Sequence, residues 1–278
     1  MQSVEAPPSV VVGIDGSEAA VGAALWGIEE AVARDIPLRL VYAIDPCEPI
    51  RRDANSFTHR FATAEIAVRS AFMAVEASQR PVKIEIEIVQ DHPVATLMRA
   101  SRSAAMMCLG ASRHSRLKRV GSTASALSAS AHCPVALLRG YDKVVRGQGG
   151  WIGVGLDQSA QNGALVTRAM EEARLRGAPL GVLVPRQLFD GPTANAAAAG
   201  WVGRDPDLNF RSVPVCGNIA DYLNEHAQSL KLFVVGTDGL GRPDSADKSV
   251  LYDTDCPLLI LRHDSEPDDE RACAAGGR

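Results

Sequence analysis

The chain has 278 residues, a formal net charge of −4 and an isoelectric point near 5.9. This acidic balance argues against the basic surface of a nucleic-acid-binding protein, and aromatic residues, at 5%, are few for base stacking. The sequence shows no apolar run long enough to span a bilayer and no signal peptide, so we expect a cytoplasmic protein without a membrane segment. The six cysteines form no Cys-x-x-Cys motif and no ligand cluster with histidine, which argues against a metal site of that kind.

The sequence repeats itself at a constant distance of 142 residues. At this distance one glycine, one aspartate, one serine, an acidic pair and a proline recur: Gly13 and Gly155, Asp15 and Asp157, Ser17 and Ser159, Glu29–Glu30 and Glu171–Glu172, Pro37 and Pro179. A period this long indicates a duplicated domain rather than a solenoid. We therefore predict two domains, at 1–140 and 151–263, followed by a disordered tail at 264–278.

Hydrophobic periodicity predicts that strands and helices alternate along the first domain. In chain order we expect a strand at Val10–Ile14, a helix capped by Ser17 and ending near Arg34, a strand at Leu38–Ile44, a helix at Phe57–Gln79, a half-exposed edge strand at Val82–Val89, a helix at Val94–Ala104, a buried strand at Ala105–Leu109, a helix at Ser122–Ala131 and a last strand at Val135–Leu138. This alternation predicts an α/β fold: two tandem, doubly wound, Rossmann-like domains, each a parallel sheet with helices on both faces.

Three connections of the first domain are expected to meet at the carboxyl ends of its strands, where such sheets bind ligands. They are Asp15–Ser17, Ala43–Asp45 and Gly110–Thr123. In the last of these, glycines permit close approach of an anion, a helix N-terminus presents free N–H groups, and the hydroxyls of Ser122 and Thr123 add donors. The pattern therefore fits a phosphate site, and it equally fits a strand end followed by a helix cap.

The blocks VVVGIDGS, VYAID and G…GST…CPV resemble the universal stress protein family over nearly all of both halves. The resemblance implies that family's adenine-nucleotide-binding fold, also described as adenine-nucleotide α-hydrolase-like. Of the family's loop pattern G-x2-G-x9-G-[ST], Gly110 matches the first glycine and Gly121-Ser122 match the end. Arg113 stands where the second glycine is expected, and the loop is two residues shorter, with 7 residues between Arg113 and Gly121.

The resemblance also implies roles for individual residues. The aspartate at the position of Asp15 lies in the family's nucleotide site, and the backbone at the position of Ala43 faces the adenine edge. The predicted cofactor-binding residues are Asp15, Gly16, Ser17, Ala43, Gly110, Arg113, Gly121, Ser122 and Thr123. ATP is the first expectation, with AMP and cyclic AMP as alternatives, and Asp15 is a candidate Mg²⁺ ligand beside the nucleotide. Arg113 belongs to a basic loop that either pairs with phosphate oxygens or forms a solvated surface.

The second copy departs from the pattern at positions that matter for a nucleotide. Gln158 replaces the glycine of the first turn, and Pro185 replaces Ala43, although proline has no N–H to offer adenine. Asp244 stands at the position of Gly121, where its charge would repel phosphate. We therefore expect no triphosphate site in the second domain.

These observations predict a non-catalytic stress-response protein in which nucleotide occupancy of the first domain acts as a switch. An interaction module that has lost nucleotide binding, and a slow ATPase, are the alternatives. The family usually dimerises through its last strand, here Val135–Leu138 or Leu258–Leu261. The two halves are therefore expected to pair with each other, with a homodimer also open, and no protein partner is identified.

Overall fold

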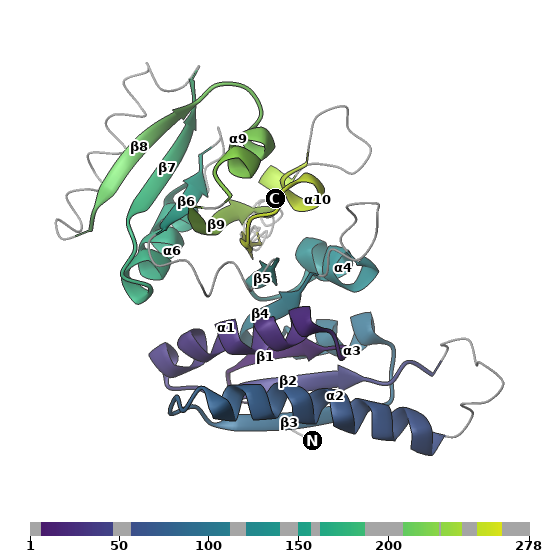
Figure 1. Cartoon of the computed structure of the whole chain (residues 1–278). Coiled ribbons are helices and arrows are strands. Elements are labelled where there is room, and N and C mark those ends of the chain that lie inside the picture. The colour runs from purple at the N-terminus through teal and green to yellow at the C-terminus, as the bar shows by residue number, and fades with distance from the viewer. Residues whose placement is uncertain are drawn as a thin grey trace, which may run out of the picture.

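The computed structural model describes residues 7–46, 57–111, 121–139, 150–156, 162–186, 208–227, 229–240 and 249–262. Residues 141–149, which lie between the two predicted domains, the predicted tail and Arg113 lie outside these residues, as do Asp157, Gln158 and Asp244. The strands are β1 (Ser9–Ile14), β2 (Leu38–Ala43), β3 (Ile84–Val89), β4 (Ala104–Gly110), β5 (Val135–Leu138), β6 (Trp151–Gly155), β7 (Leu180–Pro185), β8 (Phe210–Val215), β9 (Leu230–Gly236) and β10 (Leu258–Leu261). They form one ten-stranded sheet in the order β3-β2-β1-β4-β5-β10-β9-β6-β7-β8 (Figure 1).

Each half of the chain contributes five parallel strands in the same order, so the predicted doubly wound sheet occurs twice. The helices are α1 (Glu18–Arg34), α2 (Phe57–Ala77), α3 (Pro93–Ala100), α4 (Ser122–Ser130), α6 (Asn162–Leu175), α9 (Ile219–Glu225) and α10 (Val250–Asp253), with a short 3-10 helix η1 (Thr237–Leu240). β3 and β8 form the two edges of the sheet, which confirms the edge position predicted for Val82–Val89.

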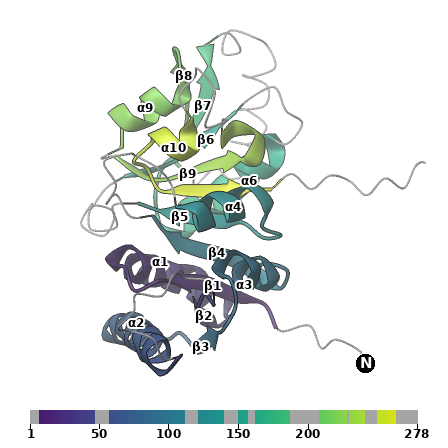
Figure 2. The ribbon, with the colours of Figure 1, turned by 90° about the vertical axis from the view of Figure 1, so that its right-hand side faces the viewer.

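The helices cover both faces of the sheet, as expected for parallel strands (Figure 2). One apolar core packs α1, α2 and α6 against one face. A second packs α3, α4, α9 and α10 against the other face. Both cores extend through the two halves. β1 lies between them, and its residues Val10, Val11 and Val12 are therefore fully buried.

The two halves meet through β5 and β10, which pair antiparallel with Leu258 opposite Leu137. This confirms the predicted pairing of the halves through their last strands. Arg139 reaches across the junction, and its buried guanidinium donates hydrogen bonds to the backbone oxygens of Leu251 and Thr254 at α10. The strands of the two halves run in opposite directions. The connections that follow the strands of the first half therefore lie at one end of the strands, and those of the second half lie at the other end.

The helix predicted at Val94–Ala104 is shorter in the structure. α3 ends at Ala100, and β4 begins at Ala104. The reason is a tertiary contact: the hydroxyl of Ser101 donates to the backbone oxygen of Met98 and accepts a hydrogen bond from the backbone N–H of His132, at 2.8 and 3.0 Å. This contact holds the end of the helix against a residue far along the chain.

Candidate functional site

A pocket of about 170 Å³ opens at the carboxyl ends of β1, β2 and β4 in the first half. Its lining comes from the ends of these strands, from the connections that follow them, and from α3 and α4, as follows: Gly13, Ile14, Asp15, Val41, Tyr42, Ala43, Pro93, Leu97, Leu109, Gly110, Thr123 and Ala124. The structure therefore brings together four of the predicted site residues, namely Asp15, Ala43, Gly110 and Thr123. Tertiary structure, rather than sequence neighbourhood, creates this grouping.

The inner wall of the pocket is apolar. Val41, Leu97 and Leu109 are buried and belong to the core on the α3 and α4 face. Sequence reasoning missed this wall, and it missed Pro93 at the start of α3. The position of Pro93 could have been predicted. β3 is parallel to β2, so the two strands have their carboxyl ends on the same side, and the helix that follows β3 must begin near the pocket.

Asp15 and Ser17 shape the turn between β1 and α1. The backbone N–H of Ser17 donates to Asp15 Oδ1 at 2.9 Å, and the Ser17 hydroxyl accepts from the backbone N–H of Ala20 at 3.1 Å. The predicted helix cap is thereby confirmed. Gly16 has φ of +83°, a left-handed conformation that favours glycine. Asp15 is exposed at the pocket and uses one carboxylate oxygen in this turn.

Close packing against α1 explains why residue 110 is a glycine. A Cβ at this position would lie 2.3 Å from the carbonyl carbon of Ala19 and 2.5 Å from the backbone nitrogen of Ala20. The first turn of α1 therefore rests directly on the end of β4. This close approach fixes Asp15 and Gly110 relative to each other, on two sides of the same pocket.

The end of the predicted phosphate loop lies at the N-terminus of α4. Gly121 is the N-cap, and α4 begins at Ser122. Thr123 lines the pocket, whereas Gly121 and Ser122 are exposed next to it. Among the residues that the structure describes, none lies within 4 Å of the place that a Cβ on Gly121 would take.

Two further side chains bridge strand ends near the pocket. His92, which precedes Pro93, has its Nε2 3.9 Å from Oδ2 of Asp45. Arg60 of α2 donates a hydrogen bond to the backbone oxygen of Asp45 at 3.0 Å. No spacing in the sequence links Asp45 to His92, so this contact was not predicted. Within the described ranges, no group of three or more His, Cys, Asp or Glu side chains is placed to hold a metal ion.

The second half differs at the corresponding strand end. β7 ends at Pro185, and β9 leads directly from Gly236 into η1. Leu240 at the end of η1 is buried in the core shared with α10, and the hydroxyl of Ser249 donates a hydrogen bond to its backbone oxygen. The chain that follows β9 thus turns inward and packs its apolar end against α10.

The fold is that of a tandem, doubly wound α/β protein, and comparisons with known proteins agree. A sequence profile of the universal stress protein family matches residues 8–139. The chain is 43% identical to the universal stress protein Rv2028c of Mycobacterium tuberculosis strain H37Rv, over 94% of this chain and 98% of that protein. It is 45% identical to the universal stress protein Rv3134c of the same strain, over 91% of this chain and 96% of that protein. The chain belongs to the universal stress protein family.

A solved structure shows the same fold over both halves. The crystal structure of a universal stress protein from Archaeoglobus fulgidus superposes with a TM-score of 0.70, at 14% identity, and covers 91% of this chain and 98% of that one. At this identity the likeness concerns the fold alone. Among the helices that the structure describes, none combines the length and the apolar character needed to cross a membrane.

Proposed function

We propose that the first half of the chain binds one adenine nucleotide, with ATP as the first candidate, and that occupancy acts as a regulatory switch without strong catalysis. The observation that carries this proposal is the pocket itself. Asp15, Ala43, Gly110 and Thr123 come from three separate connections and line one cavity with an apolar inner wall. A cavity of this kind, apolar with a few convergent polar groups, is typical of small-molecule sites.

Each part of the pocket suits one part of a nucleotide. The apolar wall of Val41, Leu97 and Leu109 would receive the adenine ring, with the backbone of Ala43 at the ring edge. The carboxylate of Asp15 would accept hydrogen bonds from the ribose hydroxyls. The N-terminus of α4 would place N–H groups and the Thr123 hydroxyl toward phosphate oxygens.

Magnesium fits this site only together with the nucleotide. Asp15 is the one carboxylate among the described residues that line the pocket, and Mg²⁺ is usually held by one or two carboxylates plus substrate phosphates. The presence of a single carboxylate in the described lining also argues against catalysis. A slow ATPase needs a group that positions water near the γ-phosphate, and the one carboxylate in the lining already accepts the Ser17 N–H. We therefore favour a switch over an enzyme.

Titration calorimetry with ATP, AMP and cyclic AMP tests the proposal on the full chain. Gly121→Asp introduces a negative charge at the α4 N-terminus, and Gly121→Ala is the matched control because a Cβ at this position lies within 4 Å of no described residue. We expect one site per chain, at least tenfold weaker binding for Gly121→Asp, and unchanged binding for Gly121→Ala. Absence of heat with all three nucleotides at millimolar concentration would overturn the proposal and favour an interaction module. Phosphate release from ATP by the wild type, lost in Asp15→Ala, would favour the slow ATPase.

A further inference from the structure

The exposed large apolar side chains of the described residues gather at one end of the molecule. They are Phe61, Ile66 and Met73 of α2 and Ile86 of β3. α2 lies beside β3, at the end of the sheet that is farthest from the second half (Figure 1). Ile66, Met73 and Ile86 are the most exposed, with exposed fractions of 71%, 57% and 51%. A group of exposed apolar side chains in one place is typical of an interaction surface.

The backbone of β3 is open on its outer side. The backbone oxygens of Lys83 and Val89 accept hydrogen bonds from N–H groups on the β2 side. Because backbone groups alternate in direction along a strand, those of Ile84, Ile86 and Ile88 point away from β2. No other strand of the described chain pairs with β3. Such a row of outward N–H and C=O groups is a template for a further strand.

The opposite edge of the sheet, β8, is built differently. The backbone oxygen of Asn209 accepts a hydrogen bond on the β7 side, so the outward positions of β8 are Phe210, Ser212 and Pro214. Proline has no N–H to offer, and it is typical of an edge that does not take a further strand. β3 contains no proline. Of the two edges, β3 is therefore the one that is suited to extension.

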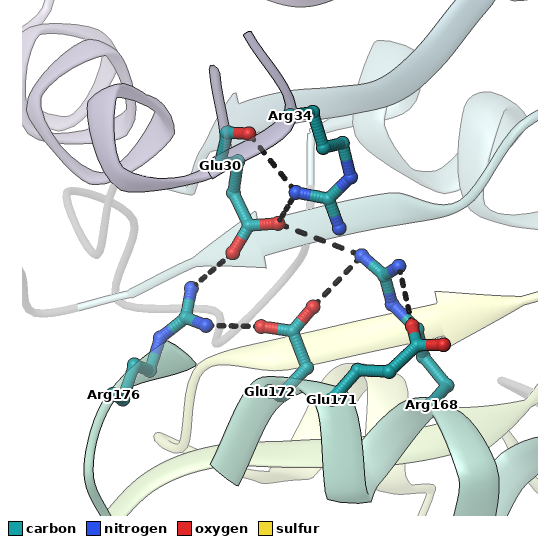
Figure 3. A network of polar contacts seen from close by, with 6 residues as sticks. All are labelled: Glu30, Arg34, Arg168, Glu171, Glu172 and Arg176. Carbon is teal, nitrogen blue, oxygen red and sulfur yellow. Dashed lines mark hydrogen bonds and ion pairs between the residues drawn. The ribbon is translucent and has the colours of Figure 1, made fainter. Parts of the chain in front are cut away.

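The joint between the halves shows how this fold extends its sheet. β5 and β10 pair antiparallel, and a cluster of acidic and basic side chains joins the equivalent helices α1 and α6 across the joint (Figure 3). Its members are Glu30, Arg34, Arg168, Glu171, Glu172 and Arg176. Within it, Nη2 of Arg176 lies 2.5 Å from Oε1 of Glu30 in the other half. Since β5 and β10 are both used in this joint, a second copy of the chain needs another surface.

The charges of β3 favour one register for pairing with a second copy. In an antiparallel pair about a two-fold axis through Ile84, Lys83 stands opposite Glu85 of the second copy, and the reverse pair follows by symmetry. Lys83 and Glu85 already lie 2.7 Å apart within one strand, with both side chains in contact with solvent, so both can share the contact. An axis through Ile86 would instead place Glu85 opposite Glu87 twice, and directly opposed like charges are unfavourable.

The flank of α2 that faces the free edge carries charges of both signs. The other flank faces β1, because Ala67 Cβ lies 3.4 Å from the place that a Cβ on Gly16 would take. At about 100° per residue, Glu65, Arg69 and Glu76 stand roughly 160–200° around the helix from Ala67. All three are exposed. They therefore point away from β1, toward β3 and the edge of the sheet.

This flank matches the same two-fold axis. Pairing about Ile84 sets the two α2 helices antiparallel, side by side. Arg60 of α2 donates a hydrogen bond to the backbone oxygen of Asp45, just beyond the end of β2. From there the midpoint between Arg69 and Glu76 lies about 19 Å back along the helix, or about six residues of a strand, which is the level of the axis to within about one strand residue. Arg69 then stands opposite Glu76 of the second copy.

We propose that β3 and the adjoining flank of α2 form the surface through which two copies of the chain associate, with their β3 strands antiparallel about a two-fold axis at Ile84. In such a symmetric interface each favourable pair occurs twice, Lys83 with Glu85 and Arg69 with Glu76. The interface covers the apolar side chain that β3 exposes. It joins the sheets of two copies in the way that β5 and β10 join the two halves.

Sedimentation velocity of the full chain over a range of concentrations tests this surface by charge exchange. We expect the wild type to dimerise reversibly. Arg69→Glu and Glu76→Arg each oppose like charges and should weaken dimerisation by at least about tenfold, whereas the double variant restores both pairs and should regain the wild-type association. Arg102→Glu, an exposed reversal in the turn between α3 and β4, is the matched control and should follow the wild type.

Three results would overturn the proposal. The first is a wild type that stays monomeric at millimolar concentration. The second is a dimer that both single reversals leave unchanged, which would place the contact elsewhere on the chain. The third is a double variant that associates no better than the single ones, because Arg69 and Glu76 would then not face each other.

Hydrogen exchange of the wild type locates the surface without any variant. The N–H groups of Ile84 and Ile86 point away from β2, so their exchange should slow as the concentration rises and dimers form. The N–H groups of Phe210 and Ser212 take the equivalent outward positions on β8, and their exchange should stay the same. Concentration-dependent protection at β8, or at neither edge, would contradict the assignment to β3.

Discussion

Gly110→Ala tests the close packing that fixes one wall of the pocket. The added methyl group would lie 2.3 Å from the carbonyl carbon of Ala19, whereas ordinary contact begins at 3.4 Å. The first turn of α1 must therefore retreat by roughly 1 Å, because backbone atoms cannot rotate away as a side chain does. Overpacking of this kind costs about 1–3 kcal/mol, and we expect the upper part of this range.

The assay is urea unfolding followed by far-UV circular dichroism, with Gly121→Ala as the control. Gly121 has φ of −57°, and no described residue lies within 4 Å of its Cβ position, so its substitution should change the free energy of unfolding by less than about 0.5 kcal/mol. Gly110→Ala should also weaken nucleotide binding, since Asp15 lies in the turn that leads into α1 and is hydrogen-bonded to its N-cap Ser17. Equal unfolding midpoints for the two variants would refute the reasoning, because they would show that α1 does not rest on Gly110.

Three further predictions follow from individual side chains. Asp15→Ala removes the carboxylate of the pocket and a bond at the start of α1, so we expect nucleotide affinity to fall at least tenfold in calorimetry and stability to fall by about 1 kcal/mol. Unchanged affinity would contradict the assigned role. Arg139→Met leaves two backbone oxygens of the second half without their buried donor and should cost about 3 kcal/mol in urea unfolding, whereas the exposed Arg262→Met should cost less than about 0.5 kcal/mol; equal losses would count against the buried junction. Iodoacetamide at pH 8 should modify the exposed Cys216 and spare Cys133, whose pKa burial raises to about 12. Peptide mapping by mass spectrometry checks this, and equal rates at both thiols would be the contrary result.

The fold was predictable from the sequence because its signals are local. β-branched runs such as that at Val10–Ile14 specify strands, and Ser17 specifies the start of α1. The end of α3 was predicted wrongly, since no helix-breaking residue follows Ala100 before β4, and the hydrogen bond from the backbone N–H of distant His132 to Ser101 lies at the end of the helix instead. Local propensity cannot anticipate such a contact.

The site was predictable in part for the same reason. Asp15 and Gly110 carry recognisable turn and strand-end patterns, whereas Leu97 reads as an ordinary core position of a helix. The acidic pairs of the duplication were visible at Glu30 and Glu172, yet the pattern gave no sign of their burial. Burial there depends on α1 and α6 lying together at the joint, which only the three-dimensional arrangement of the halves determines.

The central claim is that one of the two duplicated halves binds an adenine nucleotide. The most direct measurement is to denature the purified full-length chain, quantify adenine nucleotides in the supernatant, and reload the native protein to saturation for a second count. We expect at most one nucleotide per chain as purified, one per chain at saturation, and no nucleotide retained through purification by the weaker-binding Gly121→Asp. Two nucleotides per chain would contradict the assignment to the first half alone, and none at saturation would contradict nucleotide binding altogether.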